Sequence, residues 1–322
     1  MVEQVFPNIF RMEIPIPHSP LKSINSYVIK GDQRFLIIDT GMNQPQCRKA
    51  MASALMELDV DLKRTDFFIT HLHADHLGLV PEFAVKSTKI YFNYPDEKSM
   101  KSSSYWNEID VTSLANGLSE KELMSAMQEL PGRKIQNQSL LDFTPLKEGD
   151  RLSIGEYVFQ CVETPGHTQG HLCLYEKRTK IFFSGDHILQ DITPMVSIWG
   201  YDGNPLNEYL KSLNKINLFD ISCIFPGHRQ IFTDYRKRID ELRKHHEIRT
   251  EEILTILKSG SKNAYQVASQ MTWNIDCNRW EVFPPLQKWF ASGEALAHLQ
   301  YLHASNRLKK EIVKGKVFFS LL

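Results

Sequence analysis

The 322-residue sequence lacks the marks of membrane, secreted and disulfide-rich proteins. No apolar run approaches the roughly 18 residues that span a bilayer. The first ten residues include Glu3 and Pro7, and they have neither the basic start nor the unbroken apolar stretch of a secretory signal. The five cysteines are odd in number, scattered and never spaced as C-x-x-C. We therefore expect a cytoplasmic protein with reduced thiols and no membrane association.

Three common catalytic signatures are also missing. The chain has no G-x-S-x-G nucleophile elbow, no G-x-x-x-x-G-K phosphate loop and no G-x-G-x-x-G dinucleotide motif. Serine hydrolases of the elbow type, phosphate-loop enzymes and dinucleotide enzymes are therefore not supported. With 16 glycines and 15 prolines, low-complexity and collagen-like chains are excluded as well.

What is present is the composition of a soluble globular protein, with 42% hydrophobic and 24% charged residues. A chain of this length is typical of two domains. The formal net charge is zero, but residues 235–322 contain 15 Lys and Arg against 9 Asp and Glu, a balance of +6. Residues 1–234 contain 23 against 29, a balance of −6. The basic C-terminal part is either a solvated helical surface or a contact for nucleic acid.

The beginning of the chain alternates between predicted strands and a predicted helix. Residues 26–29, 35–38 and 66–70 are short runs of β-branched, aromatic or other apolar residues. Between the second and third run, residues 46–58 carry apolar residues at helical spacing. Strands and helices that alternate in this way indicate an α/β fold, in which functional sites lie at strand ends.

Residues 95–140 depart from this pattern, because they are rich in Ser, Lys, Glu and Met. A predicted helix near their centre would place Leu118, Leu123, Met124 and Met127 on one face. We interpret the segment as a helical insertion, which is either a lid or an ordinary pair of surface helices.

Further strands are predicted after the insertion, at residues 157–162, 171–175, 180–183 and 223–225. A helix over residues 205–216 precedes the last of them. These elements continue the α/β pattern up to about residue 234.

The C-terminal part is predicted to be mainly helical. Helices are expected over residues 235–257, 264–271 and 293–308, and residues 313–322 alternate around a glycine like a small hairpin. Three helices followed by a hairpin suggest a winged-helix module. The predicted domains are therefore a catalytic domain and a winged-helix-like domain, over residues 1–234 and 235–322.

The strongest chemical signal is the segment His71-Leu-His73-Ala-Asp75-His76, which follows a predicted strand directly. Imidazole and carboxylate together are a donor set for zinc and similar divalent cations. A helix alone would not bring His71 and His73 to one face, whereas a loop at a strand end can turn alternate side chains toward two neighbouring ions. The segment therefore predicts a metal site.

Three further residues stand in matching turn contexts. His167 lies in Thr-Pro-Gly-His-Thr-Gln-Gly-His, Asp186 in Phe-Ser-Gly-Asp and His228 in Phe-Pro-Gly-His. Each follows a glycine, which allows a sharp turn and a close approach of the backbone. One such residue alone is more often an ordinary loop residue, but their order and contexts together indicate additional metal ligands.

The motifs of this chain and their order resemble those of the metallo-β-lactamase superfamily. In chain order they are H-x-H-x-D-H, T-P-G-H-T-x-G-H, S-G-D and P-G-H. The Ile-Asp-Thr-Gly sequence at residues 38–41 resembles the early strand and turn of the same family. The resemblance extends over about residues 5–234. It implies an αββα sandwich with a dinuclear metal site, and the C-terminal segment is similar to the winged-helix domain that some members carry.

The resemblance also implies a metal-binding role for seven residues, divided between two ions and a bridge. The ligands of the first ion would be His71, His73 and His167. The ligands of the second ion would be Asp75, His76 and His228. Asp186 would bridge both ions, since two neighbouring cations require an anionic bridge. Asp75 would also be catalytic, by orienting the attacking water or accepting its proton.

These features predict a metal-dependent hydrolase in which a hydroxide that bridges the two ions attacks the substrate. Zinc is the expected metal, and iron or manganese would suit a mixed His/Asp site as well. The best-known true β-lactamases of this family carry a cysteine where Asp186 stands, whereas the thioesterase, nuclease and lactonase branches resemble this chain. We therefore expect a small-molecule substrate that is a thioester or a related ester.

Two other functions stay open. A metal-dependent nuclease or phosphodiesterase that acts on RNA or a nucleotide would use the same ion pair, with the basic C-terminal part near phosphates. The second alternative is not an enzyme but a winged-helix protein that binds nucleic acid or has a regulatory role. Residues 293–301, however, contain no Arg or Lys for a recognition helix. Otherwise the C-terminal domain would pack on the catalytic domain, close its pocket or mediate a homodimer.

Two further expectations concern the surroundings of the metals. Asp39 is a candidate for orienting a ligand histidine through its second ring nitrogen. Aromatic residues in the insertion and in residues 192–205 are candidates for substrate walls or for ordinary core packing. These aromatic residues are Tyr94, Tyr105, Trp106, Trp199 and Tyr201.

Overall fold

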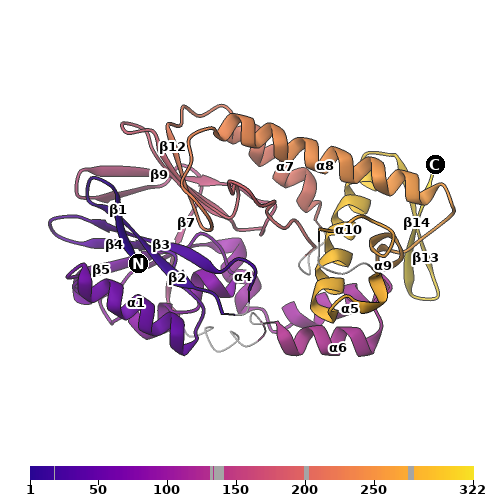
Figure 1. Cartoon of the computed structure of the whole chain (residues 1–322), viewed down its shortest axis with the longest axis horizontal. Helices are drawn as coiled ribbons and strands as arrows, with labels where there is room; N and C mark the ends of the chain where they lie inside the picture. The colour runs from indigo at the N-terminus through magenta and orange to yellow at the C-terminus, as the bar shows by residue number, and fades with distance from the viewer. Residues whose placement is uncertain (18, 131–132, 134–140, 199–202, 275–278) are drawn as a thin grey trace. The chain divides into compact units, whose positions relative to one another are not determined.

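A computed structural model describes residues 1–17, 19–130, 133, 141–198, 203–274 and 279–322 (Figure 1). The chain divides into two compact units. The first unit comprises Met1–Lys101, Ile135–Pro194 and Ser212–Ile239. The second unit comprises Ser102–Lys134, Met195–Lys211 and Asp240–Leu322. Most of the predicted insertion is therefore grouped with the C-terminal part of the chain.

The first unit is built on two mixed β-sheets. The larger sheet has the spatial order β1 (Val2–Phe6), β2 (Ile9–Pro15), β3 (Ser23–Lys30), β4 (Phe35–Ile38), β5 (Thr65–Phe68), β6 (Ile90–Asn93), β7 (Phe143–Leu146). The smaller sheet has the order β12 (Cys223–Pro226), β11 (Ile181–Gly185), β10 (Leu172–Glu176), β9 (Tyr157–Glu163), β8 (Arg151–Ile154). Strands β4 to β7 run parallel, as do β11 and β12, and the other neighbours are antiparallel.

Among the described residues, the first unit contains four α-helices in addition to its two sheets, and two more helices extend into the second unit. The helices within the first unit are α1 (Pro45–Glu57), α2 (Ala74–Leu77), α3 (Val80–Phe83) and α4 (Tyr94–Lys101), with a 3-10 turn at Leu62–Arg64. Helices α7 (Pro205–Ile216) and α8 (Tyr235–Leu257) cross the boundary between the units, and both have the predicted bounds. Helix α1 lies along the larger sheet (Figure 1).

The alternation of side chains along each strand produces two cores. In β4, Phe35 and Ile37 point into a core shared with α1, whereas Leu36 and Ile38 point into a core between the two sheets. Because both faces of this strand are covered, its sequence is apolar throughout. On the outer face of the smaller sheet, Phe219 packs edge-on against Tyr175 at 5.0 Å between ring centroids. The first unit is therefore the α/β sandwich expected from the sequence.

The second unit has its own helical core and a small sheet. Its remaining elements are α5 (Tyr105–Ala115), α6 (Glu120–Glu129), α9 (Ala264–Ala268), the 3-10 turn Trp280–Val282, α10 (Pro285–Ala304), β13 (Leu308–Val313) and β14 (Lys316–Leu321). Helix α6 begins with a capping box, in which Ser119 and Glu122 satisfy each other's backbone N–H groups. Leu123 and Met127 are buried as predicted, but Met124 is 65% exposed and does not share their face.

The predicted bounds of the last helix, residues 293–308, and of the hairpin, residues 313–322, are wrong. Helix α10 begins at Pro285, where proline is favoured in the first turn, and ends at Ala304. Asn306 has a φ of +55°, a left-handed conformation that stops a helix. Leu308, which the prediction made the last residue of the helix, instead begins β13, and residues 308–313 pair with β14.

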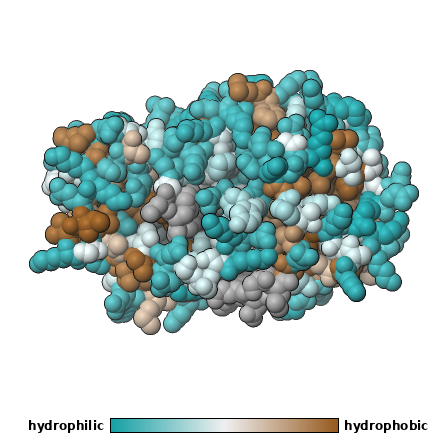
Figure 2. All heavy atoms as spheres, turned by 180° about the vertical axis from the view of Figure 1, so that it is seen from behind, coloured by the Kyte–Doolittle hydropathy of each residue, from teal (hydrophilic) through white to brown (hydrophobic). Residues whose placement is uncertain are grey.

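In the described part of the chain no helix combines the length and the apolar character that crossing a membrane requires. The face drawn in Figure 2 is mainly hydrophilic, and its hydrophobic residues occur in separate groups. The cysteines Cys47, Cys161, Cys173 and Cys223 are all free. Cys277 lies outside the described residues.

Candidate metal centre

The segment that follows β5 carries four of the seven predicted ligands. The chain leaves the larger sheet after Phe68, and His71 is fully buried within the turn. His73 precedes α2 as its N-cap, and Asp75 and His76 lie in that short helix. The strand end and the helix start thus place imidazole and carboxylate groups close together.

The other three predicted ligands follow strands of the smaller sheet. Strands β9, β11 and β12 run in one direction, because β10 is antiparallel to both β9 and β11 while β12 is parallel to β11. Their carboxyl ends therefore meet at one edge of the sheet. His167 follows β9, Asp186 follows β11 and His228 follows β12.

Two glycines make room for these ligands. Gly185 has a φ of +48°, which favours glycine, and a Cβ atom there would lie 2.7 Å from Nε2 of His171. A Cβ atom on Gly227 would lie 2.6 Å from Oδ1 of Asp186 and 2.9 Å from Cε1 of His76. Gly227 is thus required by close packing against two ligand side chains, and Gly185 by close packing against His171.

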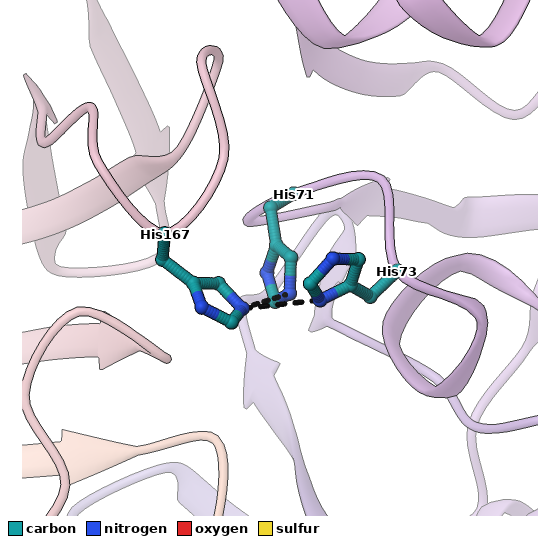
Figure 3. Close-up of side chains that lie close together, drawn as sticks. All are labelled: His71, His73 and His167. Carbon is teal, nitrogen blue, oxygen red and sulfur yellow. Dashed lines mark hydrogen bonds between the residues drawn. The ribbon is translucent and has the colours of Figure 1, made fainter. Parts of the chain in front are cut away.

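Three histidines form the first group of candidate ligands. In Figure 3 the rings of His71 and His73, from the segment after β5, point toward His167, from the loop between β9 and β10. Nε2 of His167 lies 3.2 Å from Nε2 of His71 and 3.0 Å from Nδ1 of His73. Ligands of a tetrahedral zinc ion at about 2.0–2.1 Å from the metal would be about 3.4 Å apart. The three nitrogens therefore have a separation close to that of a zinc site.

The remaining ligands form a second group beside the first. Nε2 of His228 lies 3.4 Å from Oδ2 of Asp75 and 3.4 Å from Oδ2 of Asp186. The same Asp186 oxygen lies 3.5 Å from Nε2 of His76 and 3.7 Å from Nε2 of His167. Oδ2 of Asp186 is thus within 3.7 Å of histidine nitrogens from both groups.

Histidine pKa values are shifted in opposite directions in the two ligand groups. Burial, together with the neighbouring imidazoles, lowers the pKa of His71 and lowers the pKa of His73 to about 3. These two rings are neutral near pH 7, so each has a nitrogen lone pair available for a cation.

In the second group the carboxylates and imidazoles change each other's pKa. Burial alone would lower the pKa of His228, but Asp186 and Asp75 raise it to about 10. Burial would likewise lower the pKa of His76, which Asp39 and Asp186 raise. Burial would raise the pKa of Asp75 and Asp186, but the histidines hold both below the usual range.

The arrangement fits a pair of divalent cations. Nε2 of His76, Nε2 of His228 and Oδ1 of Asp186 are buried without a hydrogen-bond partner. Leaving such an atom unpaired costs about 1–3 kcal/mol. Three overlapping groups of side chains offer ligand atoms that lie within 4.8 Å of one another. The groups are His71, His73 and His167; His71, His76 and Asp186; and Asp75, His76 and His228.

The hydrogen bond expected for Asp39 is present. Oδ2 of Asp39 lies 2.8 Å from Nδ1 of His76 and accepts a hydrogen bond from Oγ1 of Thr70 at 2.9 Å. The Thr70 N–H donates to Oδ1 of the same carboxylate at 2.9 Å. Nδ1 of His76 therefore donates to Asp39, and its Nε2 remains directed at the site.

His228 is held by strand β3, a contact that was not predicted. Its Nδ1 donates to the carbonyl oxygen of Ser23 at 2.8 Å, so its Nε2 points to the second group. The buried Asn25 side chain donates to the carbonyl oxygens of Pro226 at 3.0 Å and Arg229 at 2.8 Å. In the sequence, Asn25 is marked only as a polar residue that directly precedes the predicted strand over residues 26–29.

His171 belongs to the motif but contacts the backbone instead of joining the ligand groups. Its Nε2 accepts a hydrogen bond from the Asp186 N–H at 3.1 Å. Its Nδ1 then carries the proton and donates to Oγ1 of Thr164 at 2.8 Å. His171 thus helps to place Asp186.

Asp96 is a further buried carboxylate, which we did not predict from the sequence. It is fully buried near the start of α4 and accepts hydrogen bonds from residues on both sides of the three-histidine group. Burial raises its pKa to about 6, although the hydrogen bonds from Thr168, Gly170 and Leu72 oppose that shift. The available sequence signal is its place in the first turn of α4, three positions after the last residue of β6.

The structure describes three of the five aromatic residues that were candidates for substrate walls or for core packing. Tyr105 and Trp106 pack into the helical core of the second unit, which is the core-packing alternative. Tyr94 is 61% exposed at the start of α4. Trp199 and Tyr201 lie outside the described residues.

Comparisons with known proteins agree with this geometry. A family model described as the metallo-beta-lactamase superfamily matches residues 20–228. The relative called probable metallo-hydrolase YqjP, from Bacillus subtilis, is 23% identical over 334 residues, which cover 98% of each chain. An atrochrysone carboxyl ACP thioesterase from Emericella nidulans is 23% identical over 238 residues, which cover 74% of this chain and 61% of that protein.

A similar solved structure covers both units. The metallo-beta-lactamase family protein TTHA1429 from Thermus thermophilus has a TM-score of 0.84 and 24% sequence identity, covering 99% of this chain and 100% of that chain. At this identity the likeness concerns the fold alone.

Proposed function

Because the chain belongs to the metallo-beta-lactamase superfamily and is a metallo-hydrolase, we propose that its substrate is a thioester or a related ester, which it hydrolyses. The observation that carries the proposal is the convergence of two ligand groups on the carboxylate of Asp186. A similar protein named as a thioesterase supports the substrate class.

Seven residues would hold two divalent cations, with zinc as the expected metal. The first cation would be held by His71, His73 and His167. The second would be held by Asp75, His76 and His228. Asp186 would contact both, because its Oδ2 atom lies within 3.7 Å of a histidine from each group. When bound, the cations would lower the pKa of a water and polarise the substrate carbonyl.

The protein's own groups would supply orientation and proton transfer. Asp75 is an ionised carboxylate, because its pKa lies below the usual range, and its side chain is 13% exposed. As an ionised and partly exposed carboxylate it would orient a water by accepting a hydrogen bond, and it would act as a weak base for the water's proton. No serine or cysteine nucleophile is needed, so we expect no covalent acyl-enzyme.

The substrate class is tested by assaying zinc-loaded protein against acyl thioesters, carboxyl esters, a β-lactam and a phosphodiester. We expect thiol release from a thioester, and loss of activity on treatment with chelator. The Asp186→Ala variant should lose at least about 100-fold in kcat/KM. Retained hydrolysis in this variant, or fewer than one tightly bound metal per chain under metal-replete conditions, would contradict the proposal.

A second candidate function is a nuclease or phosphodiesterase acting on RNA or a nucleotide. It is favoured by the basic balance of residues 235–322, with 15 Lys and Arg against 9 Asp and Glu. Cleavage of single-stranded RNA that chelator abolishes would support it. Thioester hydrolysis without RNA cleavage would exclude it.

We infer that the C-terminal segment is winged-helix-like, with a domain boundary near residue 234. The order of the end of α8, then α9, α10 and the β13–β14 hairpin supports this inference. Lys288 is the one Lys or Arg of helix α10, and it is 8% exposed and pairs with Glu122 at 3.0 Å. A role in reading DNA is therefore disfavoured, and the absence of a gel shift with random duplex at low salt would agree with a structural role.

A further inference from the structure

Asp96 joins two loops that carry the histidines of the first ligand group. Its Oδ2 accepts a hydrogen bond from the N–H of Leu72, which stands between His71 and His73, at 3.0 Å. The same oxygen accepts from Oγ1 of Thr168, the residue after His167, at 2.7 Å. One carboxylate oxygen is thus shared between the two loops.

The second oxygen strengthens the same connection. Oδ1 of Asp96 accepts a hydrogen bond from the N–H of Gly170 at 2.6 Å. A Cβ atom on Gly170 would lie 2.6 Å from the backbone nitrogen of Asp96, so the glycine is needed for this approach. The carboxylate lies in the first turn of α4, where the helix dipole favours a negative charge. The Asp96 carboxylate, which accepts all three hydrogen bonds, is fully buried.

The two loops come from different sheets. The His71 and His73 loop follows β5 of the larger sheet, and the His167 loop lies between β9 and β10 of the smaller sheet. One backbone hydrogen bond, from the N–H of Leu172 to the carbonyl oxygen of Thr70 at 2.8 Å, also joins them. Asp96 adds three hydrogen bonds, one from Leu72 between the first two histidines and two from residues that follow His167, so it can control the separation of the histidine nitrogens.

We propose that Asp96 is a positioning residue for the three-histidine group, because its carboxylate holds the His71 and His73 loop against the His167 loop. The inference rests on the proposed metal-dependent function. Asn cannot replace Asp here, because its amide NH₂ would face a backbone N–H whichever way it turns. One donor would then be left unsatisfied, and the loops would separate.

Metal affinity measured by competition with a chelator tests the proposal. Each ligand group is isolated by removing a ligand of the other, with His228→Ala leaving the three-histidine group and His73→Ala leaving the second group. In the His228→Ala background, Asp96→Asn should weaken zinc binding by about 10–100-fold. In the His73→Ala background, Asp96→Asn should change affinity less than about threefold. A purely structural role would lower both affinities alike.

Asp66→Asn is the matched control, since Asp66 is also a buried carboxylate and lies in β5 of the larger sheet. It pairs with Arg34 at 2.5 Å and accepts from the Lys89 N–H at 2.9 Å, away from the ligand loops. It should lower the melting temperature without changing zinc affinity. If Asp96→Asn does not fold, Thr168→Val, which removes one of the three donors, should weaken the same group in the same direction.

Two results would overturn the inference: unchanged zinc affinity of the three-histidine group in Asp96→Asn, or an equal loss in both backgrounds. In the Thr168→Val variant, unchanged affinity would overturn it in the same way. Failure of the proposed function has a different signature, because the unmodified protein would then either bind no zinc or bind zinc without hydrolysing a thioester or ester.

Discussion

Asp39 and His76 are 37 positions apart in sequence, yet Oδ2 of Asp39 lies 2.8 Å from Nδ1 of His76 and both side chains are buried. Asp39 follows β4 directly and His76 lies beyond the end of β5, so the pairing of two parallel strands brings them together. The contact fixes which ring nitrogen of His76 carries a proton and leaves the other for a cation.

Asp39→Asn should therefore weaken metal binding in the second group. In the unmodified protein both carboxylate oxygens of Asp39 accept hydrogen bonds, from Thr70 and from His76. The Asn side chain has only one acceptor oxygen. We expect zinc affinity in the His73→Ala background to fall by about 10–100-fold. Asp32→Asn, in an exposed turn, is the control and should leave affinity unchanged. Equal affinities for Asp39→Asn and the control would show that the contact does not orient the ligand.

Metal stoichiometry tests the bridging role of Asp186. We expect two zinc ions per chain in the unmodified protein, measured by elemental analysis after removal of loosely bound metal. Asp186→Asn keeps the shape of the side chain but loses its charge, so one or both ions should be lost in dialysis. Two retained ions in this variant would contradict a carboxylate bridge.

Metal binding in the two groups should depend differently on pH. Without a cation the pKa of His228 is raised to about 10, so this ring is protonated near pH 7 and must lose its proton to bind. Raising the pH therefore favours binding, by about tenfold per pH unit for each proton displaced. His73, with a pKa of about 3, is already neutral and adds no such dependence.

Zinc titrations at pH 6, 7 and 8 measure this difference. The steeper rise with pH is expected in the His73→Ala background, where the second group remains, and the shallower rise in His228→Ala. Proton release can be checked by calorimetry in buffers with different ionisation enthalpies. Identical slopes in the two backgrounds would refute the assignment of proton displacement to the second group.

Gly227→Ala should disturb the centre more than the fold. The added methyl would lie 2.6 Å from Oδ1 of Asp186 and 2.9 Å from Cε1 of His76, so both ligands would have to move. We expect at least about tenfold weaker zinc binding. In Gly149→Ala the methyl meets nothing within 4 Å, although the φ of +82° is unfavourable for alanine. That control should lose about 1–2 kcal/mol of stability and keep its zinc affinity.

The candidate ligands could be found from the sequence because each lies in a short local motif. Several His and Asp residues stand next to glycine at the ends of strands. When several such motifs follow one another along the chain, metal binding explains them better than a purely structural role. Helices α7 and α8 were also predicted with correct bounds, since their periodic apolar residues are a local signal. The grouping of residues 102–134 with the C-terminal part was not predicted, because it depends on packing between distant segments.

The amino-acid sequence was enough to name the chemistry: His and Asp side chains in turn motifs carry metal-ligating atoms whatever their surroundings. Folding alone established which of those atoms face one another and what holds them there. Asp96 meets Leu72, Thr168 and Gly170 across 24, 72 and 74 positions, and Asn25 meets Pro226 across 201. Such hydrogen bonds leave no periodic trace in the chain, since they arise only when two sheets pack and bring their strand ends together.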